Sequence, residues 1–281
     1  MVCSYLAVCL KQTIRSSEEY LSMDLKLNNQ VAFIAGSSRG IGRAIAATLL
    51  DEGASIVLTG RDEASLKSTA AELTTPETHD RILAIRGDFA DPTTIANSFA
   101  RTLSHFGRLD HLIANLGTGS GKPGWDQPDE EWSRLFELNF FASTRLTQAA
   151  LPHLLANPNG GSILYISSIV AIEATPAPLP YSAAKAALNN YSKNLARQLG
   201  PQKIRVNTIA PGNIYFPGGS WERHLANRRE AVESMLQTEV PLRRFGTPEE
   251  IASLAAYLCS PQAAFATGAC YVMDGGQTRT L

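Results

Sequence analysis

The chain has 281 residues, of which 44% are hydrophobic and 18% charged, and its formal net charge is −1. This composition is ordinary for a globular protein, and the length suits one large α/β domain. A nearly neutral chain has no electrostatic attraction to nucleic acid or to an anionic membrane, so neither is expected as a partner.

Residues 1–22 stand apart from the rest of the chain. Their apolar beginning has no basic residue ahead of it and is too short to span a bilayer. We expect an accessory extension there, followed by one domain over 23–281. The cysteines form no C-x-x-C pair and no metal-binding spacing, which predicts reduced thiols in a cytoplasmic protein. They are Cys3, Cys9, Cys259 and Cys270.

Short apolar runs alternate with helical patterns along the remaining chain. Strands are predicted at 31–35, 55–59, 81–85, 109–114, 162–166, 204–210 and 269–273. Helices are predicted at 41–51, 62–73, 92–105, 129–156, 180–199 and 248–258. Strands that alternate with helices form βαβ units, and continuously apolar strands are buried on both faces of a parallel sheet. The sequence therefore predicts a doubly wound α/β fold.

One segment, 211–240, breaks this rhythm between the sixth strand and the last helix. It contains Pro217-Gly-Gly-Ser and a basic stretch that ends at Arg229. Long irregular insertions in compact domains are often lids. We therefore predict an irregular lid here.

A glycine-rich turn, Ala35-Gly-Ser-Ser-Arg-Gly-Ile-Gly42, connects the first strand to the first helix. Small residues let backbone N–H groups approach a pyrophosphate, and a helix N-terminus favours its negative charge. The strand–turn–helix context is what a dinucleotide site requires.

Three side chains further along predict acid–base chemistry. Tyr181 and Lys185 lie four residues apart, and Ser168 lies thirteen residues before the tyrosine. A phenol has an ordinary pKa of about 10, and a lysine one helical turn away favours the phenolate and lowers that pKa. A hydroxyl from a neighbouring segment can hold a carbonyl oxygen beside the tyrosine. Neighbouring strand side chains point to opposite faces, so only one of Ser167 and Ser168 can face the site.

These motifs, in this order and at these spacings, resemble the short-chain dehydrogenase/reductase family from about residue 27 to 277, including its 3-oxoacyl-[acyl-carrier-protein] reductases. The resemblance implies a single Rossmann-type domain with a seven-stranded parallel sheet in the order 3-2-1-4-5-6-7 and helices on both faces. It implies that 211–240 closes over the substrate. The implied reaction is hydride transfer between a carbonyl and a secondary alcohol, without a metal.

The resemblance also assigns roles by position. Tyr181 is the general acid or base, and Ser168, at the family's spacing, polarises the substrate carbonyl. Lys185 lowers the tyrosine pKa and binds the nicotinamide ribose, while Asn139 holds a water that links Lys185 to solvent. The implied dinucleotide contacts are Gly36, Ser38, Arg39, Gly40, Ile41, Gly42, Arg61, Asp88, Phe89, Asn115, Gly117, Tyr181, Lys185, Pro211, Gly212 and Ile214.

Some positions depart from the family pattern or allow two interpretations. Ala35 stands where threonine is usual, which removes a supporting hydrogen bond worth about 1 kcal/mol. Leu116 is larger than the usual residue and changes the local packing. Asp88 is either an adenine contact or part of a helix start that includes Asp91-Pro92.

The end of the second strand predicts NADP(H) as the cofactor. An NAD-binding protein normally has an acidic residue there for the ribose 2′-hydroxyl, whereas this chain has Gly60 followed by Arg61. Asp62 and Glu63 are expected to start the next helix and cap it. Arg39 supplies a second guanidinium, so that two could bind a 2′-phosphate.

The substrate side is less defined. Glu173, Pro176 and Leu179 are expected to border a pocket for a small carbonyl or alcohol. Its apolar wall, or alternatively core or lid packing, is assigned to Trp125, Tyr215, Phe216 and Trp221. A basic rim for an acyl-carrier substrate, or else a solvated helix face, is assigned to Arg223, Arg228 and Arg229.

Two further expectations concern activity and assembly. A catalytically inactive relative that binds nucleotide as a regulator or scaffold is the alternative function, but such relatives usually lose the tyrosine or lysine. Helices 129–156 and 180–199 are apolar on more than one face, which requires a second partner. The resemblance implies that these two helices pair between subunits, so we expect a homo-tetramer or dimer.

Overall fold

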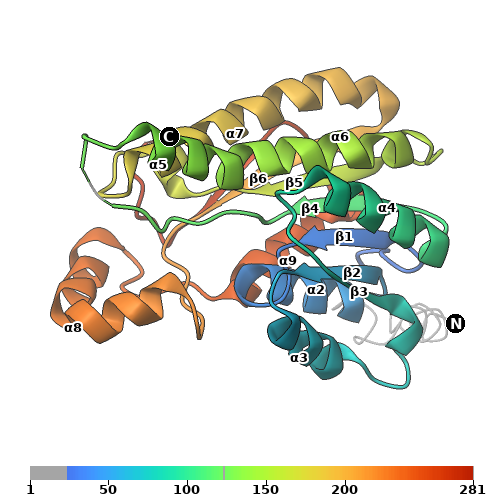
Figure 1. Ribbon diagram of the computed structural model, residues 1–281, viewed down its shortest axis with the longest axis horizontal. Coiled ribbons are helices and arrows are strands. Elements are labelled where there is room, and N and C mark those ends of the chain that lie inside the picture. Colours follow the sequence, from blue (N-terminus) through green and yellow to red (C-terminus); the bar gives the residue numbers. More distant parts are fainter. Residues whose placement is uncertain (1–23, 123, 281) are drawn as a thin grey trace, which may run out of the picture.

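The structure is a computed structural model that describes residues 24–122 and 124–280, so the predicted extension 1–22 lies outside the described residues. Seven parallel strands form one sheet in the order β3-β2-β1-β4-β5-β6-β7, with helices on both faces (Figure 1). The predicted fold class and strand order are confirmed. The domain boundary near residue 23 stays a prediction.

The elements follow the predicted alternation closely. The strands are β1 (Val31–Ala35), β2 (Ser55–Gly60), β3 (Ile82–Arg86), β4 (His111–Ala114), β5 (Gly161–Ile166), β6 (Ile204–Pro211) and β7 (Cys270–Met273). The helices are α2 (Gly40–Asp51), α3 (Glu63–Leu73), α4 (Pro92–Phe106), α5 (Asp129–Phe136), α6 (Ala142–Leu155), α7 (Leu179–Leu199), α8 (Ser220–Glu239) and α9 (Pro248–Cys259). Within the described ranges, no helix combines the length and the apolar character that crossing a bilayer requires.

Alternate side chains of each central strand divide the core into two layers. In β1, Ala32 and Ile34 pack in a cluster with residues of α2 and α9, whereas Phe33 and Ala35 pack with residues of α4, α6 and α7. This alternation follows from the two-residue period of a strand. Because every residue of β1 is buried, the sheet is covered on both faces and its carboxyl edge is where functional loops can gather.

The helix predicted over 129–156 is interrupted by a π-helical turn, Glu137–Phe141, between α5 and α6. Inside this turn the Asn139 side chain donates to the Leu135 carbonyl oxygen at 2.9 Å. A side-chain donor thus reaches a backbone acceptor in the preceding turn. Single π turns inside α-helices frequently occur at functional sites.

The segment predicted to be an irregular lid is largely helical. Its Ser220–Glu239 part forms α8, with one non-helical residue, Arg228 (φ −155°). Only Val232 and Leu236 of this helix are buried, so its apolar face is too narrow to stand out in the sequence. Figure 1 shows α8 away from the two helical layers, on the side where the strands end.

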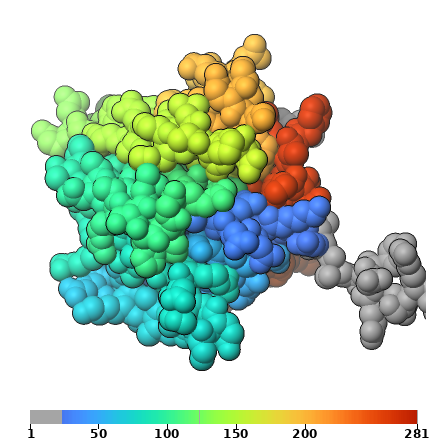
Figure 2. Space-filling view, turned by 90° about the vertical axis from the view of Figure 1, so that its right-hand side faces the viewer, coloured from blue at the N-terminus to red at the C-terminus, as the bar shows by residue number. Residues whose placement is uncertain are grey.

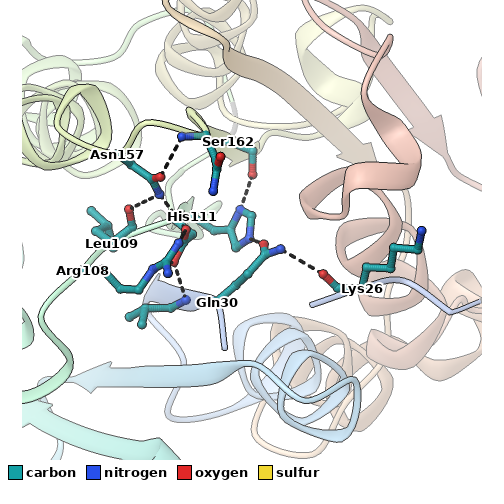
Figure 3. A network of polar contacts seen from close by, with 10 residues as sticks. Lys26, Gln30, Arg108, Leu109, His111, Asn157 and Ser162 are labelled. Atoms are coloured by element: carbon teal, nitrogen blue, oxygen red, sulfur yellow. Dashed lines mark hydrogen bonds and ion pairs between the residues drawn. The ribbon is translucent and has the colours of Figure 1, made fainter. Parts of the chain in front are cut away.

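The amino ends of the strands carry a buried polar network. Figure 2 views this side of the molecule, and Figure 3 shows the network in detail. His111 Nε2 lies 2.6 Å from Gln30 Oε1, and its Nδ1 lies 2.8 Å from Ser162 Oγ. Because the Gln30 amide nitrogen donates to the Lys26 carbonyl oxygen, Gln30 Oε1 accepts from His111. The network therefore favours the neutral imidazole with its proton on Nε2.

We expect acid to destabilise the fold through His111. Burial lowers the pKa of His111 from 6.5 to about 4, and the charges of Arg205 and Arg108 act in the same direction against that of Asp110. Between pH 6.5 and 4, His111 is therefore protonated in the unfolded chain but neutral in the folded chain. The contribution of His111 to the free energy of unfolding is fully present above pH 6.5 and is lost as the pH falls toward 4. The loss between pH 7 and 5 is about 2 kcal/mol.

Urea unfolding at the two pH values measures this loss. His111→Gln replaces the imidazole by an amide, which can still donate and accept hydrogen bonds but does not titrate, so it is the matched control. The variant should lose markedly less stability than the wild type between pH 7 and 5. Equal losses in the two proteins would contradict the assignment.

Candidate active site

The predicted acid–base residues meet at the carboxyl edge of the sheet. Ser168 follows β5 and begins a short 3₁₀ turn, and Tyr181 and Lys185 lie one helical turn apart in α7. Ser168 lies close enough to the Tyr181 phenol to lower its pKa. The hydroxyl pair can therefore contact the same substrate oxygen.

The two neighbouring serines differ in orientation, as the strand argument requires. Ser167 is 5% exposed, and its hydroxyl lies 3.4 Å from the Lys185 carbonyl oxygen, to which it donates. Ser168 is instead the side chain whose hydroxyl lowers the pKa of the Tyr181 phenol. The structure thus places Ser168, and not Ser167, beside the phenol.

Lys185 is 3% exposed, and its ammonium is held by backbone carbonyls. Its Nζ donates to the Ile166 carbonyl oxygen at 2.9 Å and to the Leu116 carbonyl oxygen at 3.3 Å. Burial lowers the pKa of Lys185 to about 8. The lysine can therefore lose a proton close to neutral pH.

The pKa of Tyr181 differs from the sequence-based expectation. Burial raises it, because a phenolate loses its hydration, and the hydrogen bond with Ser168 only partly lowers it. The expectation that Lys185 sets this pKa is not met, because desolvation outweighs the other influences on the phenol. Tyr181 is accordingly a neutral phenol at neutral pH and able to donate a proton.

Asn139 lies beside this group and is fully buried. Its side chain bonds both backbone groups of Thr118, accepting from the amide nitrogen at 3.0 Å and donating to the carbonyl oxygen at 3.1 Å. A Cβ at Gly117 would lie 2.4 Å from Asn139 Oδ1 and 3.0 Å from Lys185 Nζ. Glycine at 117 (φ +147°) is therefore what lets the loop after β4 pass over both side chains.

The glycine turn forms a close-packed cradle at the end of β1. A Cβ at Gly42 would lie 2.2 Å from the Gly36 carbonyl oxygen and 2.6 Å from Asn115 Nδ2. Asn115 Nδ2 in turn donates to that carbonyl oxygen at 2.8 Å. No larger residue fits at Gly42. A close-packed glycine turn that opens a helix is the backbone arrangement that a pyrophosphate site needs.

Two hydroxyl groups brace this turn against β2. Thr59 Oγ1 accepts from the Gly36 amide nitrogen at 2.9 Å, and Ser37 Oγ accepts from the Thr59 amide nitrogen at 2.8 Å. The sequence analysis noted that Ala35 lacks a supporting hydroxyl but did not identify Thr59. A buried threonine opposite a glycine turn in the neighbouring strand is the signal that could have found it.

A cavity of about 480 Å³ opens in front of the cradle. Nine of the predicted dinucleotide contacts line it: Gly36, Ser38, Arg39, Ile41, Arg61, Asp88, Phe89, Asn115 and Gly117. Gly40 is covered instead, since a Cβ there would lie 2.6 Å from the Phe216 ring. Gly42 is buried in the cradle, and Pro211, Gly212 and Ile214 follow or end β6 outside this lining.

Asp91, and not Asp88, caps the start of α4. Asp91 caps α4 by accepting from the amide nitrogens of Thr93 and Thr94. Asp88 lines the cavity, so it is available to contact a ligand there. Phe89 also borders the cavity, but its ring packs edge-on against Phe33 in the core.

The far end of the cavity carries two guanidinium groups. Arg39 and Arg61 both line it, and Arg39 Nη1 donates to the Gly218 carbonyl oxygen at 3.2 Å. Asp62 caps α3, as predicted, by accepting from the Ser65 amide nitrogen at 2.8 Å and from its hydroxyl at 2.6 Å. Hydrogen bonds from Ser65 lower the pKa of Asp62.

The substrate-side residues divide between several environments. Trp125 is 86% exposed, while Tyr215 and Trp221 each pack against Phe245. Phe216 lines the cavity in front of the glycine cradle, and not a separate apolar wall. Leu179 is half-exposed, and Glu173 accepts from the Arg279 amide nitrogen at 3.0 Å. The lid arginines, Arg223, Arg228 and Arg229, lie on the exposed face of α8.

A doubly wound parallel sheet with a glycine turn at its carboxyl edge defines the class of Rossmann-type proteins. Comparison with known sequences agrees. A family model described as enoyl-(acyl carrier protein) reductase matches residues 35–278. An uncharacterized oxidoreductase of Methylorubrum extorquens is 34% identical over 89% of this chain and 98% of its own length. The 7alpha-hydroxysteroid dehydrogenase of Escherichia coli is 33% identical over 92% of this chain and 98% of its own length.

Solved structures extend the likeness to the whole fold. L-sorbose reductase from Gluconobacter frateurii, complexed with NADPH and L-sorbose, superposes with a TM-score of 0.84 at 35% identity, covering 92% of this chain and 100% of that one. A 7 alpha-hydroxysteroid dehydrogenase, complexed with NADH and 7-oxo glycochenodeoxycholic acid, superposes with a TM-score of 0.83 at 31% identity, covering 92% and 98%. The chain belongs to the short-chain dehydrogenase/reductase family of oxidoreductases.

Proposed function

We propose that this protein interconverts a carbonyl and a secondary alcohol with NADP(H) as the hydride carrier. The observation that carries the proposal is the meeting of Ser168, Tyr181, Lys185 and Asn139 beside a cavity built on a glycine cradle. The cradle fits a dinucleotide, because its glycines cannot be enlarged and its backbone faces a cavity of about 480 Å³. When bound, the nicotinamide would supply the hydride that reaches the carbonyl carbon.

The chain's own residues handle the proton and the substrate oxygen. Tyr181 donates the phenol proton to that oxygen as the carbon accepts the hydride, and Ser168 donates a hydrogen bond to the same oxygen. Both donors act where negative charge develops, and this is the contribution that accelerates such reactions. The charge of Lys185, one helical turn away in α7, would partly offset the desolvation of the resulting phenolate, and Asn139 fixes the Thr118 backbone beside the lysine.

The choice of NADP(H) rests on this chain's residues, because the two solved relatives carry different dinucleotides. Two arginines line the far end of the cavity, and the carboxylate that follows Arg61 in the chain, that of Asp62, is occupied as a helix cap. A 2′-phosphate accepts bidentate hydrogen bonds from guanidinium groups. The two arginines at this end of the cavity therefore support a phosphate pocket there.

The test is a spectrophotometric assay of NADPH and NADH consumption with a bulky apolar ketone, a sugar ketone and a 3-oxoacyl thioester, and of the reverse reaction with the corresponding alcohols. Turnover of at least one compound with NADPH is expected. Dinucleotide binding without turnover of any of them would favour a regulatory or scaffold role instead. Absence of binding would contradict the assignment of the cavity.

We also propose that the protein forms a homo-tetramer or dimer. Phe141, the last residue of the π turn, and Leu155, the last residue of α6, are 45% and 49% exposed, and a partner subunit would cover these apolar side chains. Light scattering at micromolar concentration should give a mass of two or four chains. A mass near the 30.3 kDa of one chain would contradict the proposal.

A further inference from the structure

Arg145 in α6 joins two walls of the dinucleotide cavity. Its Nη1 donates to the Ala90 carbonyl oxygen at 3.2 Å. The same guanidinium binds both carboxylate oxygens of Glu137, with Nη2 to Oε2 at 2.9 Å. One side chain therefore contacts the loop after β3 and the start of the π-helical turn.

The first of these contacts supports the wall that carries the predicted adenine contacts. Ala90 lines the cavity together with Asp88 and Phe89, and its amide nitrogen donates to Asp88 Oδ1 at 3.1 Å. A donor fixed on the Ala90 carbonyl oxygen therefore restrains the peptide that holds Asp88. This loop has no strand or helix of its own to restrain it.

The second contact spans the turn that carries Asn139. Residues eight apart on an α-helix are separated by about 12 Å along the axis, so only two extended side chains can connect them. Glu137 begins the π turn and Arg145 follows it by one helical turn. The ion pair thus connects the first residue of this turn to α6 beyond it, and so spans the turn that directs Asn139 toward Thr118.

We propose that Arg145 is a positioning residue that links the adenine side of the cavity to the asparagine beside the catalytic lysine. The inference rests on the proposed function, and no part of Arg145 itself reaches the reacting atoms. Because the Arg145 and Glu137 side chains are 31% and 37% exposed, water screens the pair and the expected effects are moderate. The positioning role of Arg145 follows from where the ion pair lies and not from the strength of the pair.

The decisive experiment compares two hydride donors, NADPH and reduced nicotinamide mononucleotide, which lacks the adenine half. For Arg145→Met, KM for NADPH should rise and kcat should fall, each by about fivefold. With the mononucleotide, kcat should fall by the same factor while KM stays within twofold. Glu137→Gln leaves the Ala90 contact in place and should reduce kcat alone.

Arg43→Met is the matched control, because it removes an arginine–glutamate pair of similar exposure between α2 and α3. It should change none of these parameters beyond twofold. An Arg145→Met enzyme with unchanged kcat for the mononucleotide would overturn the link to Asn139. An unchanged KM for NADPH would overturn the link to the adenine wall.

A binding measurement separates this proposal from the proposed function. Calorimetry with adenosine 2′,5′-bisphosphate reports the adenine wall without any turnover, and Arg145→Met should raise its Kd by about fivefold. If the wild type binds this probe but reduces no carbonyl, the proposed function fails while the adenine link is still tested. An unchanged Kd in the variant counts against Arg145 whatever the activity.

Discussion

Replacing Tyr181 by phenylalanine is expected to lower kcat for carbonyl reduction by roughly 10²–10⁴-fold, the usual contribution of a general acid. The phenylalanine ring keeps the packing of α7 against the loop after β4, where a Cβ at Gly119 would lie 3.4 Å from the tyrosine ring. Only the proton donor is removed. Cofactor affinity and thermal stability should therefore stay close to those of the wild type.

The measurement is single-turnover reduction under conditions where chemistry limits the rate. Tyr191→Phe is the matched control, because it removes the same hydroxyl from the same helix at a site that faces Tyr165 and Thr147 in the core. That variant should retain its kcat. A Tyr181→Phe enzyme with more than about a tenth of the wild-type rate would refute the general-acid assignment.

Much of this fold could be predicted because its signals are local. Each central strand is a short apolar run bounded by turn residues, and parallel pairing follows from the alternation with helices. Tyr181, Lys185 and the glycine turn are likewise recognisable by spacing within one element. Residues whose function depends on their own helix or turn can be found this way.

The parts that could not be predicted depend on contacts between distant segments. Thr59 braces the glycine turn from the neighbouring strand, and Phe216 reaches Gly40 from the segment after β6. Helix α8 has only two buried residues, so its sequence gives a weak periodic signal. The pKa of Tyr181 was mispredicted for a related reason, since burial is a property of the assembled site.

Replacing Arg61 by alanine is expected to lower kcat/KM for NADPH by about 10–100-fold and to leave that for NADH within about twofold. Arg61 follows Gly60, where a Cβ would lie 2.8 Å from that of Ser38. The turn thus leaves no room for an acidic side chain at 60, the usual position of a ribose-binding carboxylate. Arg61 lines the cavity just beyond it, and within the described chain its guanidinium has no hydrogen-bond or ion-pair partner.

The comparison needs both dinucleotides with the wild type, Arg61→Ala and Arg101→Ala. Arg101 is an exposed arginine of α4 outside the cavity, so its loss changes the net charge by the same amount without touching the proposed phosphate pocket. Arg39→Ala should act in the same direction as Arg61→Ala, because both guanidinium groups line this end of the cavity. A wild type that prefers NADH would refute the phosphate pocket. An NADPH preference that survives Arg61→Ala would move the phosphate contact to Arg39 alone.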